Sequence, residues 1–260
     1  MRDVWEQRID RAAHLAGRDE AARPLLLEYA RLLRLQRDSY ETLRRNACGL
    51  TGSLDRDLPA VRASVAPMLA EVAEIGPPGL AAEARLILDG AGPAIDSMLL
   101  TGWHAASGQQ FFPKIALQPY AQFLAAIDVR PVDRHLPQGK YACPFCGGPP
   151  QLSILQSAGD ADGGGRQLLC ATCFTAWPFR RVLCAHCGEE DERRLGYFHG
   201  RPFDHLRVDA CDTCRRYLKT VDLTRLGIAV PVVDEVAGAS LDLWAIEHGY
   251  EKIELNLVGL

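Results

Sequence analysis

Apolar and charged residues alternate with a helical period over the first 130 residues. The clearest case begins at Pro24, after which apolar side chains recur every three or four positions as far as Leu43. The region 111–126 is also apolar but holds two prolines, so we expect two short helices there. Further helices are predicted over residues 3–17, 57–74, 80–89 and 93–101.

After residue 140 the period changes from helical to strand-like. Residues 152–156 alternate in the manner of a strand, 160–165 predicts a turn, and 167–169 predicts the returning strand. A second pair of strands is expected over 195–199 and 205–208.

The last 31 residues change pattern once more, and three elements are predicted there. They are an extended run over 230–233, a helix over 234–248 with Leu241, Trp244 and Ile246 facing inward and Gly249 at its C-terminal end, and a terminal strand over 253–257.

Eight of the nine cysteines form four Cys-x-x-Cys pairs, which flank the two predicted strand pairs. The pairs are Cys143/Cys146, Cys170/Cys173, Cys184/Cys187 and Cys211/Cys214. Residues 147–169 separate the first two pairs and residues 188–210 the last two, which is 23 residues in each case, whereas residues 174–183 form a joint of only 10. The equal loops indicate a duplicated unit and favour one metal for the first four cysteines and one for the last four. An interleaved pairing, first with third and second with fourth, stays open.

Each half joins a glycine-bearing turn to a turn without glycine. Gly147 and Gly188 follow the second cysteine of their pairs, where a positive φ is often needed, whereas Phe174 and Arg215 hold this position in the other two pairs.

Four thiolates complete a tetrahedral site that suits Zn²⁺ and mononuclear iron alike. We predict that both metals support folding; a redox role in addition stays open. His186, His199 and His205 are not needed as ligands, because eight thiolates already fill two sites.

These patterns predict an α+β fold, in which an N-terminal all-α domain precedes two tandem rubredoxin-like or zinc-ribbon metal domains. Residues 131–140 form the expected linker, and Cys48 is expected to be a small buried side chain rather than a reactive thiol. The predicted domains are a helical domain at 1–138, the first Cys₄ ribbon at 139–180, the second at 181–222, and an extension with a helix and a short strand at 223–260.

Charge and composition limit the kinds of partner that we expect the chain to bind. The net charge of −4 gives no overall attraction to nucleic acid, and residues 140–219 are nearly balanced, with eleven basic and nine acidic side chains. No run reaches the ~18 apolar residues of a membrane span. The first residues lack the apolar core of a secretory signal, so we expect a cytoplasmic protein whose cysteines are metal thiolates rather than disulfides. We find no catalytic set and no cofactor-binding motif other than the metal ligands.

Several longer motifs surround the cysteine pairs or lie outside them. They are Cys143-Pro-Phe-Cys146-Gly-Gly-Pro149, Leu169-Cys170-Ala-Thr-Cys173 leading to Trp177 and Arg181, Cys211-Asp-Thr-Cys214-Arg-Arg-Tyr217-Leu218-Lys219, Leu117-Gln118-Pro119-Tyr120 and His248-Gly249-Tyr250. Together they resemble the FdhE-type formate dehydrogenase accessory proteins. The resemblance carries all eight paired cysteines over as metal ligands, whereas the first 100 residues match in character only.

The resemblance implies a cytoplasmic maturation factor that binds the catalytic subunit of respiratory formate dehydrogenase before export and is associated with rubredoxin-like iron binding. The leading hypothesis is therefore a non-enzymatic chaperone that carries two ions per chain, Fe or Zn. The alternative is a rubredoxin-like redox protein that donates electrons during maturation. Neither reading involves nucleic acid or insertion into a membrane, and both leave open whether the chain forms a homodimer.

Overall fold

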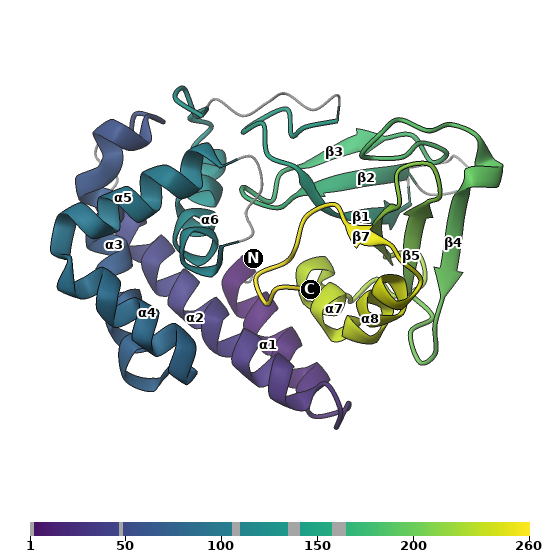
Figure 1. The fold of residues 1–260 in the computed structure, drawn as a ribbon, viewed down its shortest axis with the longest axis horizontal. Coiled ribbons are helices and arrows are strands. Elements are labelled where there is room, and N and C mark those ends of the chain that lie inside the picture. Colours follow the sequence, from purple (N-terminus) through teal and green to yellow (C-terminus); the bar gives the residue numbers. More distant parts are fainter. Residues whose placement is uncertain (1–2, 47–48, 106–109, 135–140, 158–164) are drawn as a thin grey trace.

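The computed structural model describes residues 3–46, 49–105, 110–134, 141–157 and 165–260. Within them, a helical region precedes a β-sheet, and two short helices follow near the C-terminus (Figure 1). Cys48, most of the predicted linker and most of the predicted turn at 160–165 lie outside the described residues. The helices of the first region are α1 Val4–Ala16, α2 Arg23–Arg45, α3 Leu54–Ile75, α4 Pro78–Asp89, α5 Ala91–His104 and α6 Phe111–Ala126.

The expectation of two helices over 111–126 was wrong, because α6 runs through Pro119 without a break. A proline inside a helix leaves the carbonyl four residues earlier without its donor. Here the side chain of Gln36, on α2, donates from Nε2 to that carbonyl, on Ile115, at 3.2 Å. Pro113 lies in the first turn, where its missing N–H costs nothing. A tertiary contact therefore compensates for a local helix breaker.

The C-terminal predictions also need correction. The expected extended run over 230–233 is instead the start of α7, Pro231–Ala237, which is favoured by Pro231 in the first turn and by Asp234 Oδ2, which accepts from Val230 N at 2.8 Å. The predicted single helix is split, with α8 spanning Ala239–Glu247. Ile246 is 55% exposed rather than buried. The strand predicted over 253–257 is absent, and the terminal strand β7 lies just before it, at Glu251–Lys252.

The two cysteine-bearing halves share one sheet. Its strands before β7 are β1 Pro150–Gln156, β2 Gly165–Cys170, β3 Ala176–Phe179, β4 Leu195–His199, β5 Leu206–Cys211 and β6 Arg216–Asp222. The strand order is β3-β2-β1-β6-β5-β4, and β7 pairs with β6. β1 and β6 run parallel and join the halves, with Ile154 opposite Val221. The described structure is therefore α+β, as predicted, but with a continuous sheet across the boundary expected at 180/181. The domain limits themselves stay a prediction.

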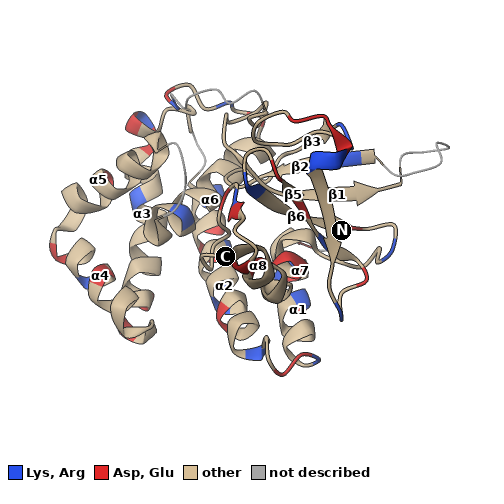
Figure 2. Cartoon of the chain, turned by 45° about the vertical axis from the view of Figure 1, so that its right-hand side comes forward, with Lys and Arg blue, Asp and Glu red and all other residues tan. Residues whose placement is uncertain are grey.

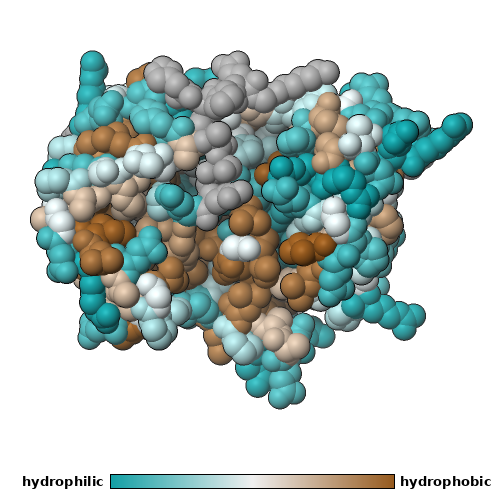
Figure 3. All heavy atoms as spheres, viewed as in Figure 1, coloured by the Kyte–Doolittle hydropathy of each residue, from teal (hydrophilic) through white to brown (hydrophobic). Residues whose placement is uncertain are grey.

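The helical region and the sheet region have a common hydrophobic core. Its buried residues come from α1 to α6, from β1, β2 and β3, from the first four paired cysteines and from α7. Apolar side chains also gather in the middle of the face seen in Figure 3, where the helices meet the C-terminal segment. Basic and acidic residues are interspersed over helices and strands alike (Figure 2). No helix among the described residues has both the length and the apolar character needed to cross a bilayer.

Asp234, on α7, connects the helical region to the second half of the sheet. Its carboxylate accepts from Arg11 Nη2 on α1 at 2.5 Å and lies 2.9 Å from Nε2 of His205, just before β5. Burial acts to raise the pKa of Asp234, but the hydrogen bonds from His205 and Arg11 outweigh burial and hold that pKa below its usual value. The carboxylate is therefore charged where it joins the two regions.

Four fully buried charged groups connect the sheet to the C-terminal segment. Lys219 on β6 and Lys252 on β7 face Glu235 on α7 and Asp242 on α8. The Lys219 ammonium lies 3.0 Å from Glu235 Oε1, and Lys252 Nζ lies 3.1 Å from Asp242 Oδ1. Tyr217 adds a hydrogen bond from its hydroxyl to Asp242 at 2.9 Å. This buried charge network gives the Tyr217-Leu218-Lys219 motif a structural role.

We predict that Glu235→Gln lowers the free energy of unfolding by about 3 kcal/mol at pH 7, because it leaves two buried ammonium groups facing one carboxylate. Burial acts to raise the pKa of Glu235, but the charges of Lys219 and Lys252 lower it to about 2. The stabilisation is thus complete above about pH 4.5 and is lost as pH falls toward 2.

Urea unfolding of both proteins, at pH 7 and then at decreasing pH, measures this difference. The control is Glu247→Gln on the exposed end of α8, which should change stability by less than about 0.5 kcal/mol. A wild-type advantage that stays constant down to pH 2 would contradict the role assigned to Glu235.

Candidate metal centres

The structure gathers the first four paired cysteines at one point. The sulfurs of Cys143, Cys146, Cys170 and Cys173 all lie within 4.8 Å of one another. Cys143 Sγ is 3.6 Å from Cys173 Sγ, and Cys146 Sγ is 3.4 Å from Cys170 Sγ. The first pair lies just before β1, and the second begins at the end of β2, so the β1–β2 hairpin closes the cluster.

The last four paired cysteines form a second cluster of the same design, also within 4.8 Å. Cys184 Sγ lies 3.7 Å from Cys214 Sγ, and Cys187 Sγ lies 3.7 Å from Cys211 Sγ. The cysteines therefore come together in the sequential grouping that the equal loops favoured, and not in the interleaved one.

The sulfur spacing matches a tetrahedral thiolate site. With a metal–sulfur bond of about 2.3 Å, neighbouring sulfurs of a tetrahedron lie about 3.8 Å apart. A disulfide would need about 2.05 Å. The observed 3.4–3.7 Å is close to the first value and far from the second. Two Cys₄ clusters with this spacing indicate two metal sites, each able to hold Zn²⁺ or a single iron.

In all four Cys-x-x-Cys turns the residue after the second cysteine has a positive φ. Gly147 and Gly188 have φ of 74° and 80°, as expected. Phe174 and Arg215, in the turns that lack glycine, have φ of 56° and 57°. The residue types at these two positions do not indicate a positive φ, for which glycine is the usual residue. The requirement of the turn therefore overrides the local preference of Phe174 and Arg215.

The pKa values of the thiols in the first cluster are shifted in opposite directions. The pKa of Cys146 is far below its usual value, because hydrogen bonds from Cys143, Cys170 and Cys173, together with the charge of Arg134, favour its thiolate. Burial raises the pKa of Cys170, and hydrogen bonding to Cys143 raises that of Cys173. The cluster thus already favours a thiolate, the form that binds metal.

The helical region holds the first cluster through Gln118, on α6. Gln118 accepts a hydrogen bond from Gln36 Nε2 at 2.8 Å and donates from its own Nε2 to Ala171 O, inside the Cys170–Cys173 turn, at 2.8 Å. Its neighbour Tyr120 donates to Asp57 Oδ2 at 2.7 Å. The Leu117-Gln118-Pro119-Tyr120 motif therefore fixes the helices against the metal-site backbone.

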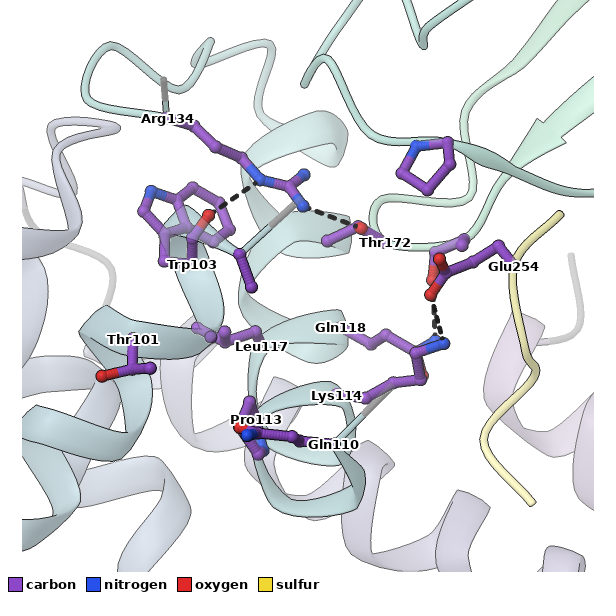
Figure 4. Close-up of a pocket in the computed structure, with 14 residues that line it drawn as sticks. Thr101, Trp103, Gln110, Pro113, Lys114, Leu117, Gln118, Arg134, Thr172 and Glu254 are labelled. Atoms are coloured by element: carbon purple, nitrogen blue, oxygen red, sulfur yellow. Dashed lines mark hydrogen bonds and ion pairs between the residues drawn. The ribbon is translucent and has the colours of Figure 1, made fainter. Parts of the chain in front are cut away.

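Arg134 is a site residue that sequence reasoning missed. Its guanidinium donates from Nη1 to Cys146 Sγ and from Nη2 to Thr172 Oγ1, both at 3.2 Å. Figure 4 shows Arg134 over Trp103, among the residues that line a cavity of about 280 Å³ between α5, α6 and the Cys170–Cys173 turn. An arginine in a segment predicted as linker carries no spacing signal, so only the fold identifies it.

The three histidines near the sheet, His186, His199 and His205, lie outside both cysteine clusters. His205 lies against Asp234, and His186 and His199 are exposed. Among the described residues, the two groups that could hold an ion consist of cysteines alone.

Comparisons with known proteins point to one family. Residues 142–181 match the model of the FdhE central domain, and residues 182–258 match that of the FdhE C-terminal domain. A protein FdhE homolog of Aquifex aeolicus is 38% identical over 120 residues, which cover 46% of this chain and 42% of the relative. One from Edwardsiella ictaluri is 30% identical over 167 residues, covering 63% and 53%. The chain thus spans about half or less of the length of these curated relatives.

The fold has a counterpart among solved structures. The crystal structure of the FdhE protein from Pseudomonas aeruginosa matches with a TM-score of 0.71 and 23% identity, covering 99% of this chain and 96% of that one. The likeness therefore includes the helical region, for which the sequence offers few specific motifs.

We predict that Gly188→Ala destabilises the protein more than Gly147→Ala. Both glycines have a similar positive φ, so each alanine costs about 1 kcal/mol from its backbone alone. A Cβ at Gly147 meets nothing within 4 Å, but one at Gly188 falls 2.4 Å from the hydroxyl of Tyr141. Adding Tyr141→Phe to Gly188→Ala should recover most of the extra loss. Thermal unfolding of the metal-loaded variants measures the loss of stability in each. Equal losses for the two alanine variants would contradict the close contact between residue 188 and Tyr141.

Proposed function

Because the chain belongs to the FdhE family by its central and C-terminal domains, we propose that it is a non-enzymatic accessory protein for the assembly of formate dehydrogenase. In this role it binds the catalytic subunit of the respiratory enzyme in the cytoplasm, before export. The observation that carries the proposal is the pair of Cys₄ clusters within domains of this family. In this proposal the chain acts by binding a client protein. Whether it does so as a homodimer stays open.

The proposal includes two ions per chain. Cys143, Cys146, Cys170 and Cys173 would hold the first, and Cys184, Cys187, Cys211 and Cys214 the second. Either iron, as in rubredoxin, or zinc suits four thiolates. The ions would supply folding energy to a sheet whose hairpins are short and whose turns are strained at Phe174 and Arg215. A redox role, the alternative expected from the sequence, stays a prediction that requires iron.

A genetic experiment tests the proposed role. In an organism that carries this gene, its deletion should abolish formate dehydrogenase activity while the catalytic subunit is still made, because an unassisted subunit would not assemble. The gene supplied in trans should restore activity. A tagged copy should also capture the catalytic subunit from extracts in which export is blocked, and extracts of cells lacking that subunit provide the control. Unchanged enzyme assembly and activity in the deletion strain would refute the proposal.

A further inference from the structure

The two cysteine clusters differ in their exposure although their turns are alike. An offset of 41 residues places Cys146 on Cys187 and Cys173 on Cys214. Cys146 and Cys173 are only 5% and 3% exposed. Cys187, by contrast, is exposed, and Cys214 is half-buried. The sequence repeat alone therefore does not produce equivalent sites.

The helical region accounts for the difference. Arg134 donates to Cys146 Sγ, and Gln118 holds the Cys170–Cys173 turn. Phe174, the residue after this turn, lies 4.8 Å below the guanidinium of Arg8, on α1. These contacts come from three separate segments of the helical region, which covers the first cluster and its second turn.

The second cluster is held mainly by its own half and the C-terminal segment. Thr213 donates to Glu189, and Tyr250 donates to Asp212, each on the solvent side of the Cys211–Cys214 turn. Cys184 and Cys211 are buried, at 6% and 2% exposure. One cysteine from each turn therefore faces inward, and its partner, Cys187 or Cys214, faces solvent.

We propose that the second cluster is an exchangeable metal site, open to a chelator or to a thiolate of another protein, and that the first is a closed structural site secured by Arg134. The inference rests on the proposal that the eight cysteines are metal ligands. In the exchange, Cys187 Sγ gives up its bond as the incoming donor forms one, and the released thiolate takes up a proton from water. No electron is transferred. At the first site, the same step first requires a local opening of the helical region.

Metal release with differential alkylation tests this. The full chain loaded with two equivalents of Zn²⁺ is mixed with an excess of a coloured chelator, pyridylazoresorcinol, and with light N-ethylmaleimide. It is then unfolded with EDTA and heavy N-ethylmaleimide. We expect one equivalent to be released quickly, with light label on Cys184, Cys187, Cys211 and Cys214. The second equivalent of Zn²⁺ should be released at least about tenfold more slowly, and light label should reach the cysteines of the first cluster at the same slow rate.

Two variants test the part assigned to Arg134. Arg134→Gln removes the charged donor to Cys146 Sγ and should speed the slow phase severalfold while leaving the fast phase unchanged. Arg130→Gln is the matched control, because Arg130 donates to Pro144 O in the same turn at 3.0 Å and no contact joins it to a ligand sulfur among the described residues. It should leave both phases unchanged.

The outcomes separate this inference from the proposed metal binding. Release of both equivalents in one phase, or light label appearing first on Cys143 and its partners, would overturn the exchange proposal while leaving two bound ions. An unchanged slow phase in Arg134→Gln would overturn the closing role of that residue. A chain that takes up no zinc would overturn both the inference and the proposed ligand set.

Discussion

Each half of the sheet has to bring four sulfurs to one point, and most of the architecture serves this constraint. A thiolate cluster tolerates little displacement, since its sulfurs must stay about 3.8 Å apart. The hairpins place two turns side by side, and every turn adopts a positive φ after its second cysteine, even at Phe174 and Arg215. The metal ions that such clusters hold would therefore offset strain that the sheet alone would not support.

The halves are also fixed to each other and to the rest of the chain. The parallel pairing of β1 with β6 makes one sheet of two repeated units. The buried charges of Lys219, Lys252, Glu235 and Asp242 hold the C-terminal helices against that sheet. Asp234 links α7 to α1 and to His205. Because Gln118 and Arg134 contact the first cluster, whereas the second is held by its own half and the C-terminal segment, a duplicated motif acquires two different environments.

The sequence predicted what depends on local spacing. Residues three or four apart gave the long helix from Pro24, alternation gave the strands, and equal loops gave the grouping of the cysteines. It failed where a distant residue decides the local outcome. Gln36 lets α6 continue through Pro119, although 79 residues separate it from the carbonyl that it satisfies, on Ile115. Arg134 reaches a sulfur from a segment without a motif. Such contacts connect residues far apart in the chain, so no local pattern predicts them.

The family assignment and the geometry meet at the two clusters, and the account depends on their being occupied. The most direct test is a crystal of the protein with anomalous difference maps collected on both sides of the iron and zinc absorption edges. We predict two peaks per chain, each about 2.3 Å from the four sulfurs of one cluster, with the edge identifying the metal. Maps without a peak at either cluster, or cysteines joined instead in disulfides, would contradict the account.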